Sequence, residues 1–331
     1  MIVWAHNSAG VKLAKLECTI PQGITWRLNE YCPNEFYIPY NVTGCTETNL
    51  AIGNFITVEF DNGLPMFGGI IDFPRRRNSD GVSITAYNAE RLFETMDIEL
   101  NIGAATPGAI FAAAIDAMNE VDPTGIVMGN VYAGGSELPT GFRAQNAWNI
   151  ITSTARNSGN EFYVYPDYEN GLLTFRANWY AKMGRDVTHL VRLDDSDIEN
   201  LNEQGPVYTR VIVYGSGASW SDKNDSGPVE SDNPKLYGLK RQLQEVLATT
   251  NLQSQIDAIA ARRIAQYQEP SHRISATLSA YDSRLHDFFI GDTVKVESFV
   301  AGGDDWAIFD DYRVYAISFD GESCKLELGK L

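Results

Sequence analysis

A motif that occurs near both ends of the chain constrains its fold more than any other feature. Residues 51–73 read AIGNFITVEFDNGLPMFGGIIDF, and residues 289–319 read FIGDTVKVESFVAGGDDWAIFDDYRVYAISF. Each begins with an apolar residue, Ile, Gly and Asn or Asp, and continues through an alternating strand that carries Val-Glu. Each then crosses a glycine-containing turn and returns in an apolar strand. The repetition predicts two similar small β-barrels, one near each end of the chain.

The match between the two segments also predicts which residues are equivalent. We expect Ile52-Gly53 to align with Ile290-Gly291, and Ile71 to align with a residue of 313–319. Other short strands with turn residues between them surround both segments, as in small barrels.

The sequence divides into three regions, which predict a mainly β fold with an α+β insertion. Residues 1–98 form the first barrel, residues 99–205 an α+β domain, and residues 206–331 the second barrel. A loop and a helix are inserted into the second barrel at about 216–269.

The α+β region has clear helix and turn signals. Thr106-Pro107 places an N-cap before a proline at the first helical position, and Asp122-Pro123 ends that helix. A second helix, AQNAWNIITSTARNSG, ends at Asn157 to Gly159. Two strands follow, separated by a turn at Asn170-Gly171. The apolar face of the first helix consists of Ile110, Phe111, Ala114, Ile115 and Met118, and that of the second of Trp148, Ile151 and Ala155.

The insertion in the last region contains a polar loop and a helix. Residues 216–234 are rich in Ser, Asp, Asn, Gly and Pro, which predicts a mobile or interacting loop. Thr249 or Thr250 is expected to cap a helix that ends before Glu269-Pro270. Its apolar positions are Leu252, Ile256, Ile259 and Ile264.

Composition and charge exclude several classes of protein. The formal net charge of −17 argues against a duplex-binding protein, which would present a basic face to phosphates. No apolar run reaches the roughly 18 residues of a membrane helix, and the N-terminus does not have the pattern of a signal peptide. We therefore expect a soluble protein, made in a cytoplasm, without stable membrane insertion. The four cysteines, Cys18, Cys32, Cys45 and Cys324, lack metal-site spacing and are expected to be reduced.

No residues assemble a recognisable catalytic or metal site. The four histidines, His6, His189, His272 and His286, form no HExxH or HxH pattern. The acidic run 193–199, with Asp194, Asp195 and Asp197, lacks the spacing of an EF-hand loop, and so do the aspartates of 302–311. We expect neither catalytic residues, a cofactor nor a tightly bound metal, and we expect that the chain is not an enzyme.

One basic cluster, Pro74-Arg75-Arg76-Arg77, is expected in a hairpin turn. It would form salt bridges with an acidic neighbouring subunit or contact phosphate.

The order of the motifs resembles the tail hub, or baseplate hub, proteins of long-tailed bacteriophages. In the first barrel the resemblance rests on Gly68-Gly69-Ile70-Ile71 and on Ala86-Tyr87-Asn88-Ala89-Glu90-Arg91-Leu92. In the middle it rests on a tryptophan-bearing helix that ends at glycine and leads into a strand hairpin, with Trp148, Ala155, Gly159, Phe162 and Gly171. The order is completed by TRVIVYGSGA, a helix, a proline and FIGDTVKV. The resemblance therefore spans nearly the whole chain.

The resemblance implies a trimeric ring whose six barrels adapt a sixfold tail tube to a threefold tip and let DNA pass. The implied partners are the tail tube or distal tail protein, the tape measure protein, and tip or fibre proteins. The implied location is the virion tail tip or baseplate, assembled in the host cytoplasm. Many hubs continue into a peptidase, lysozyme or fibre module, whereas this sequence stops at KLELGKL. We further expect an acidic ring interior that repels duplex DNA, without specific nucleic-acid binding.

Two other functions compete with a hub. A carbohydrate-binding adhesin at the tail tip is suggested by aromatic residues that could stack on sugars: Trp4, Trp26, Tyr40, Trp179 and Trp306. A glycan-processing enzyme would use scattered carboxylates. The sequence favours the structural hub, because aromatic residues in β proteins usually lie in the core.

Overall fold

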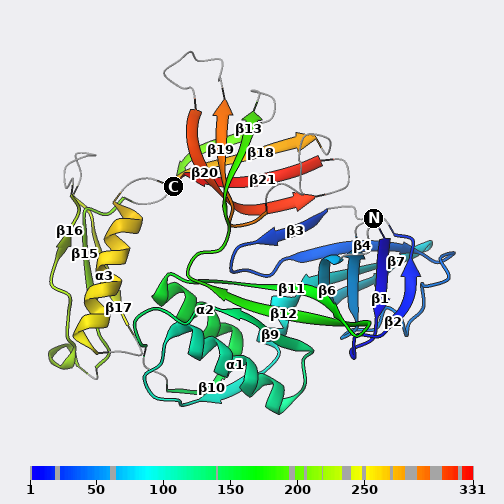
Figure 1. The fold of residues 1–331 in the computed structure, drawn as a ribbon, viewed down its shortest axis with the longest axis horizontal. Helices are drawn as coiled ribbons and strands as arrows, with labels where there is room; N and C mark the ends of the chain where they lie inside the picture. The colour runs from blue at the N-terminus through cyan, green and yellow to red at the C-terminus, as the bar shows by residue number, and fades with distance from the viewer. Residues whose placement is uncertain are drawn as a thin grey trace.

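The chain is built mainly of β-strands, with three α-helices in the parts that the structure describes (Figure 1). The computed structural model describes residues 2–18, 23–59, 65–138, 141–193, 198–204, 207–217, 219–232, 240–247, 251–268, 271–279, 289–298, 308–319 and 323–330. Within these ranges the strands form five sheets. The predicted mainly β fold with an α+β insertion is confirmed.

The first predicted barrel corresponds to a six-stranded sheet with the order β2-β1-β5-β6-β7-β4. Its first two strands form a hairpin, in which the Asn7 carbonyl accepts the Gly10 N–H at 2.9 Å. Strand β7 leads into a short helical turn, η1, whose Ala89, Leu92 and Phe93 are buried. The bounds are β1 Ile2–His6, β2 Lys12–Leu16, β4 Pro33–Pro39, β5 Phe55–Glu59, β6 Pro65–Arg77, β7 Gly81–Asn88 and η1 Ala89–Glu94.

The middle region packs two helices against a three-stranded sheet, β11-β12-β9. Helix α1 begins as predicted, because the Thr106 hydroxyl accepts the Ala109 N–H at 3.4 Å, and its C-cap is Asp122. Helix α2 ends at the predicted Gly159. The predicted apolar faces lie against the core, with Ile110, Phe111, Ala114, Ile115, Met118, Ile151 and Ala155 buried. Trp148, the remaining predicted residue, is half-buried and packs against them. The bounds are β8 Asp97–Leu100, α1 Pro107–Val121, β9 Ile126–Val131, β10 Phe142–Asn146, α2 Ala147–Ser158, β11 Glu161–Glu169 and β12 Leu172–Tyr180.

The second predicted barrel corresponds to a seven-stranded sheet that draws strands from all three regions of the sequence. Its order is β13-β19-β20-β21-β18-β14, and β3 also pairs with β20. Figure 1 shows the blue strand β3 beside the orange and red strands of this sheet. The bounds are β3 Ile24–Arg27, β13 Asp186–Leu193, β14 Ile198–Gln204, β18 Ser271–Ser279, β19 Thr293–Ser298, β20 Ile308–Phe319 and β21 Ser323–Lys330.

The predicted boundaries at residues 98 and 205 therefore do not follow the sheets. Strand β3 belongs to the first predicted region, and β13 and β14 belong to the second, yet all three pair in the last sheet. The physical reason is that alternation identifies a strand, whereas its pairing partner is set by contacts distant in the sequence.

The predicted insertion forms a small unit with its own core. Helix α3 packs on a sheet of order β16-β15-β17, and Val211, Val213, Ile256, Ile259 and Ile264 are buried between them. The bounds are β15 Arg210–Tyr214, η2 Trp220–Asp222, β16 Val229–Glu230, β17 Gln242–Val246 and α3 Gln253–Tyr267.

Two expectations about this unit were wrong. The stretch 216–234 contains η2 and β16 rather than only a loop. The N-cap of α3 is Leu252, which has an exposed fraction of 54% rather than lying on the buried face. Thr249 and Thr250 lie outside the described residues. No described helix is long and apolar enough to cross a membrane.

The predicted equivalence of the two motifs is confirmed by their hydrogen bonds. In the first copy, Gly53 N–H donates to the Ile71 carbonyl at 2.9 Å, and Ile71 N–H donates to the Asn54 carbonyl at 2.8 Å. In the second copy, Gly291 N–H donates to the Val314 carbonyl at 2.7 Å, and Val314 N–H donates to the Asp292 carbonyl at 2.9 Å. Ile71 therefore matches Val314, which lies within the predicted range 313–319.

The strand ladders of the two copies also keep the same register. Ile56 pairs with Gly69 in the first copy, and Val294 pairs with Tyr312 in the second. The order β5-β6-β7-β4 thus repeats as β19-β20-β21-β18. Both copies have a bulge just after the matched Ile71 or Val314. We call these two four-strand units the first and second meander.

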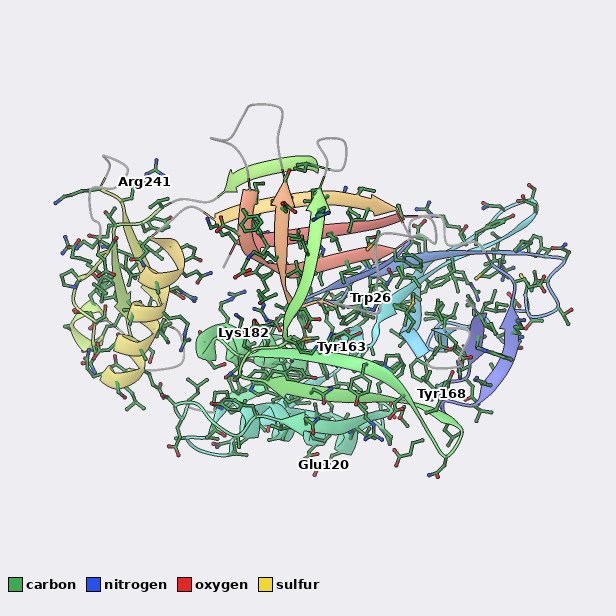
Figure 2. The ribbon with its side chains drawn as sticks, turned by 45° about the horizontal axis from the view of Figure 1, so that its top comes forward. Trp26, Glu120, Tyr163, Tyr168, Lys182 and Arg241 are labelled. Atoms are coloured by element: carbon green, nitrogen blue, oxygen red, sulfur yellow. The ribbon has the colours of Figure 1, made fainter. Side chains whose placement is uncertain are left out.

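The two large sheets and the middle hairpin share a core near the centre of the molecule. Figure 2 shows Trp26 and Tyr163 there, on strands β3 and β11. The Phe289 ring lies edge-on to both, with ring centroids 5.7 Å from Trp26 and 5.6 Å from Tyr163. We call the Ile-Gly-Asn or Ile-Gly-Asp turn at the start of each motif its corner. Just before the corner of the second meander, Phe289 therefore packs against the other regions.

Candidate interaction surface

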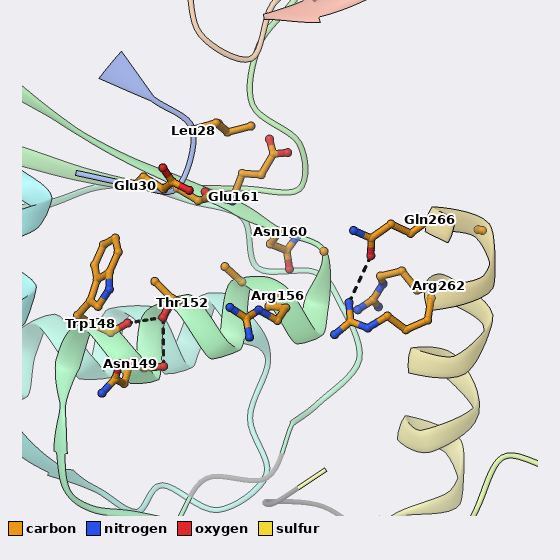
Figure 3. Close-up of a pocket in the computed structure, with 15 residues that line it drawn as sticks. Leu28, Glu30, Trp148, Asn149, Thr152, Arg156, Asn160, Glu161, Arg262 and Gln266 are labelled. Atoms are coloured by element: carbon orange, nitrogen blue, oxygen red, sulfur yellow. Dashed lines mark hydrogen bonds between the residues drawn. The ribbon is translucent and has the colours of Figure 1, made fainter. Parts of the chain in front are cut away.

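A groove of about 810 Å³ lies between α2, α3 and the turn that joins β3 to β4 (Figure 3). Helix α2 contributes Asn149, Thr152 and Arg156, and α3 contributes Arg262 and Gln266. The Thr152 hydroxyl donates to the Trp148 carbonyl at 2.7 Å, so it satisfies its own helix rather than facing the groove as a nucleophile.

Two arginines of α3 that line the groove are engaged by other parts of the chain, Arg262 by α2 and Arg263 by β17. Arg262 donates to the Asn157 carbonyl at the C-terminal end of α2, where a helix favours a cation. Burial, together with the neighbouring Arg263, lowers the pKa of Arg262. Arg263 holds Glu245 of β17 through hydrogen bonds of 2.7 and 3.0 Å. The groove is therefore a polar junction between units, and its residues do not combine a nucleophile with a base.

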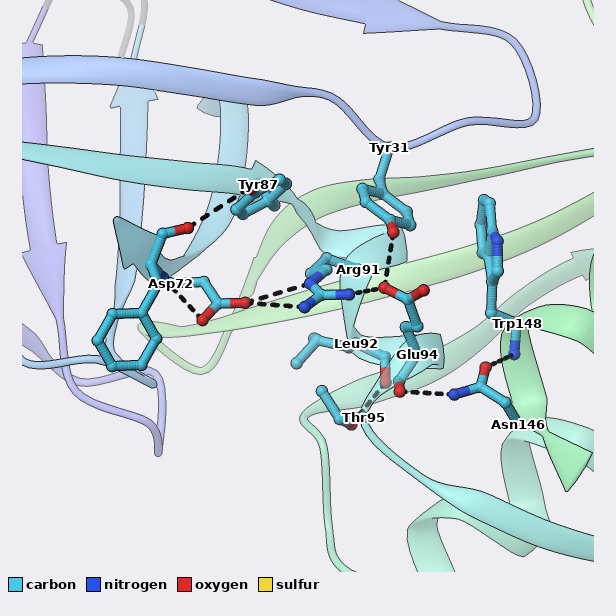
Figure 4. Close-up of polar contacts among 10 residues, drawn as sticks. Tyr31, Asp72, Tyr87, Arg91, Leu92, Glu94, Thr95, Asn146 and Trp148 are labelled. Carbon is cyan, nitrogen blue, oxygen red and sulfur yellow. Dashed lines mark hydrogen bonds and ion pairs between the residues drawn. The ribbon is translucent and has the colours of Figure 1, made fainter. Parts of the chain in front are cut away.

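A second polar cluster, the Arg91 cluster, connects the first meander to α2 (Figure 4). Arg91 donates to the Asp72 carboxylate at 3.1 and 3.2 Å and also pairs with Glu94. Tyr31 donates its hydroxyl proton to Glu94 at 2.6 Å. The members of the cluster are Tyr31, Asp72, Tyr87, Arg91, Glu94 and Trp148.

Aromatic rings surround the Arg91 guanidinium. Its central carbon lies 5.5 Å from the ring centroids of both Tyr31 and Tyr87. The rings of Tyr31 and Trp148 are 4.9 Å apart. All members of the cluster are half-buried. A half-buried group of Tyr, Trp and Arg is typical of protein–protein contacts. No sequence pattern reveals this cluster, because its members are scattered from residue 31 to 148 and share no motif.

The basic cluster is not in a turn, which corrects the prediction. Arg75, Arg76 and Arg77 form the last part of β6 and pair with β7, and the turn follows at residues 78–80. Arg75 donates to the Leu50 carbonyl at 3.0 Å, and Arg77 pairs with Glu47. Phe73, in the bulge just before them, has an exposed fraction of 67%.

The predicted histidines and cysteines are not brought together. His6 is buried between Thr57 and the Gly10 carbonyl, and burial lowers its pKa to about 4. His189 and His272 lie in β13 and β18, whereas His286 lies outside the described residues. The four cysteines are free thiols, and burial raises the pKa of Cys18 and Cys32 to about 12. In the described part of the chain, no three His, Cys, Asp or Glu residues are grouped as for a metal ion.

The structure describes some, but not all, of the acidic and aromatic residues that the sequence singled out as possible metal or sugar contacts. Asp194, Asp195 and Asp197 lie outside the described residues, and Asp310 and Asp311 lie in β20. Of the aromatic residues proposed to stack on sugars, Trp26 and Trp179 are buried, with exposed fractions of 3% and 1%. Trp4 is half-buried beneath Lys12, Tyr40 is exposed, and Trp306 lies outside the described residues.

A buried ion pair that the sequence did not reveal joins the middle region to the second meander. Arg313 donates to both carboxylate oxygens of Glu161 at 2.5 and 2.6 Å, and to the Gly291 and Met183 carbonyls at 3.0 and 2.7 Å. Both side chains are almost fully buried. They are 152 positions apart, so no local pattern could have paired them.

Solved structures of bacteriophage tail proteins share this architecture. The prophage tail protein gp18 from Listeria monocytogenes EGD-e aligns with a TM-score of 0.66 and 12% identity, covering 99% of this chain and 94% of that chain. The tail protein from Neisseria meningitidis MC58 aligns with a TM-score of 0.63 and 15% identity, covering 99% and 95%.

A more distant similarity extends to bacterial secretion. A component of the Escherichia coli type VI secretion system, described as similar to the T4 tail proteins gp27 and gp5, aligns with a TM-score of 0.55 and 10% identity over 96% of this chain and 74% of that chain. No family model and no curated protein matches the sequence. Identities this low show the fold alone. The chain has the fold of bacteriophage tail proteins, as its resemblance to tail hubs implied.

Proposed function

We propose that this chain is a structural hub at the tail tip or baseplate of a bacteriophage or phage-like particle. The observation that carries the proposal is the repeated meander, whose two copies share strand order, register and corner hydrogen bonds. The likeness of the whole chain to tail proteins supports it. In a trimeric ring, three chains would present six similar surfaces to a sixfold tail tube, while the ring itself stays threefold.

The proposal assigns partners by position in the particle. The six meanders contact the tail tube or a distal tail protein, the ring opening receives the tape measure protein, and the opposite face carries tip or fibre proteins. The ring is a virion component assembled in the host cytoplasm, and it has no catalytic role and binds no cofactor. DNA passes through an opening whose acidic wall repels it, consistent with a net charge of −17.

The mass of the protein in solution tests the ring. One chain has a mass of 36.7 kDa, so a trimer has a mass of about 110 kDa by light scattering, with a central opening in electron micrographs. A protein that stays at the monomer mass at every concentration, alone and mixed with the tube protein of the same particle, would overturn the proposal.

A gel-shift assay at low salt tests the wall of the opening. An acidic wall predicts that the assembled ring does not retard duplex DNA even at low ionic strength. Retardation that disappears steeply as salt is added would show a basic binding surface, and the acidic-wall part of the proposal would then be wrong.

The adhesin function has less support than the hub. A sugar-binding surface needs exposed rings, yet Trp26 and Trp179 belong to the core, and the Trp4 ring is covered by the Lys12 ammonium at 4.6 Å.

A further inference from the structure

The second meander has a neighbouring strand that has no counterpart beside the first meander in the part of the chain that the structure describes. Beyond its corner, the edge of β20 pairs with β3, with Ala316 opposite Arg27 and Phe319 opposite Ile24. The pairing begins directly after the bulge, where Leu28 N–H donates to the Tyr315 carbonyl at 3.0 Å. Strand β3 comes from the N-terminal region, so this contact joins the two sheets.

The matching edge of the first meander is open among the described residues. Strand β6 pairs with β5 only up to Ile70, and its later part pairs with β7 alone. We call residues 75–77 the β6 edge. Arg75 and Arg77 bind Leu50 and Glu47 through their side chains, and these contacts do not use the main-chain N–H and C=O groups of the two arginines.

The backbone of the β6 edge is oriented to accept a strand. Asn78 N–H donates to the Gly81 carbonyl at 2.9 Å, so these two residues form a hydrogen-bonded pair. Because such pairs alternate along an antiparallel ladder, Arg76 and Ser83 form the next one. The N–H and C=O groups of Arg75 and Arg77 therefore point away from β7, toward the open side.

In the order of strands along the chain, β14 has the same position in the second half as β3 has in the first. Strand β3 precedes β4, and β14 precedes β18, the counterpart of β4, once the α3 unit is set aside. In the described residues β14 pairs only with β18, which leaves its other edge open. The sequence of β14, IENLNEQ, contains two glutamates and no lysine or arginine.

We propose that β14 of a second copy of this chain adds to the β6 edge as an antiparallel strand, as β3 does to β20 within one chain. This inference rests on the proposed ring and names its subunit contact. The ring then alternates two similar junctions, β3 on β20 inside each chain and β14 on β6 between chains. Such a head-to-tail contact closes a ring and leaves neither edge exposed.

The charges of the two strands favour β14 as the strand that adds to the β6 edge. The β6 edge carries three consecutive arginines in a chain whose net charge is −17, and β14 brings Glu199 and Glu203. Opposite charges on the two strands favour their pairing and disfavour the pairing of two β6 edges with each other.

A charge exchange tests the contact. The variant Arg76→Glu/Arg77→Glu places like charges opposite β14, and Glu199→Lys/Glu203→Lys does so from the other side. Each should weaken assembly about a hundredfold, measured as the concentration at half-assembly by light scattering. The chain that carries all four substitutions should recover to within about tenfold of the original protein.

The control variant is Lys15→Glu/Lys182→Glu, which makes the same change in charge as the first variant at exposed positions of β2 and of the segment that follows β12. It should assemble like the original protein. Thermal unfolding of every variant, followed by circular dichroism, separates lost assembly from lost folding.

Hydrogen exchange gives a second readout on the same edge. The amides of Arg75 and Arg77 should exchange quickly in the monomer and slowly in the assembled ring. If the original protein assembles while the charge-reversed variants assemble equally well and both amides stay unprotected, this contact is wrong and the hub proposal stands. If the original protein never assembles, the hub proposal itself fails, and this inference fails with it.

Discussion

The two meanders share one backbone pattern, but at one matched position they contact the middle region by opposite chemistry. Ile70 and Arg313 hold equivalent positions, each one residue before the matched Ile71 or Val314. Ile70 packs against the apolar core of the middle region. Arg313 instead reaches Glu161 of that region through a buried ion pair. The hydrogen-bonded ladder is therefore what repeats, and the side chains on it differ with their surroundings.

The corners differ in the same way. Asn54 donates its side-chain amide to the Thr48 and Asn49 carbonyls within its own loop. Asp292, its counterpart, accepts the N–H groups of Phe289 and Arg185, which ties the corner to the start of β13. The first corner is thus closed by local contacts, whereas the second is covered by another segment of the chain. A less enclosed first meander is consistent with a surface that awaits a partner.

The largest expected effect comes from removing the Arg313 side chain, whose counterpart in the first meander, Ile70, is uncharged. Arg313→Ala leaves the Glu161 carboxylate buried without its cation, so we expect a loss of about 3–5 kcal/mol in the free energy of unfolding. Urea unfolding followed by intrinsic fluorescence measures it.

A double variant makes the second attachment resemble the first. Glu161→Leu/Arg313→Ile replaces the ion pair with apolar side chains, as at Ile70, and should recover part of the lost stability because no charge remains buried alone. If Arg313→Ala unfolds at the same urea concentration as the original protein, the ion pair does not hold the meander to the middle region.

The repeated ladder was predictable from sequence because its signals are local. Ile-Gly-Asn and Ile-Gly-Asp each supply a corner, the glycine has a positive φ of 88° or 85°, and alternation supplies the strand that follows. The N-cap at Thr106 and the helix end at Gly159 were predictable for the same reason. Leu252 was placed wrongly because threonines just before it gave a stronger capping signal than the residue that the fold uses.

The candidate surfaces were less predictable because they depend on contacts between distant residues. The Arg91 cluster brings together residues of three segments, and Glu161 meets Arg313 only once both sheets have formed. The three arginines form a visible cluster in the sequence, but a run of charges gives no apolar alternation, so the sequence predicts a turn where the structure has a strand. The pairing of β3 with β20 likewise depends on contacts between residues that are distant in the sequence.

The second prediction concerns Glu90, a buried carboxyl that lies just after the first meander's β7. Glu90, in the turn that follows β7, accepts the Val164 N–H at 2.9 Å, and burial raises its pKa to about 7. Because the folded state binds this proton more tightly than the unfolded state, stability is fully present below about pH 4.5 and is lost as pH rises to about 7. The loss is on the order of 3 kcal/mol for this group.

The variant Glu90→Gln isolates that contribution. The free energy of unfolding, measured by urea between pH 4.5 and pH 8, should fall with pH in the original protein more steeply than in the variant. Parallel pH profiles would mean that Glu90 titrates normally in the folded protein.

The third prediction compares the two corner glycines. Gly53→Ala meets no neighbouring atom, so it should cost only the strain of a positive φ, about 1–2 kcal/mol. Gly291→Ala adds a Cβ that would lie 3.0 Å from the Met183 carbonyl oxygen, which should add about 1 kcal/mol. Urea midpoints of the two variants give the difference. Equal costs would show that the segment over the second corner moves aside freely.

The smallest expected effect comes from the aromatic residues of the two bulges. Phe73 is mostly exposed, so Phe73→Ser should change the free energy of unfolding by less than about 0.5 kcal/mol. Tyr315 lies beneath the guanidinium groups of Arg273 and Arg313, 5.8 and 5.9 Å from their central carbons, and it covers Gly329. Tyr315→Ser should therefore cost about 1 kcal/mol. Thermal unfolding of the monomer at low concentration compares the two, because an assembled ring would cover Phe73 as well. A Phe73→Ser monomer that melts as early as Tyr315→Ser would mean that the first bulge is packed within its own chain, and the β6 edge beside it would then be closed rather than open.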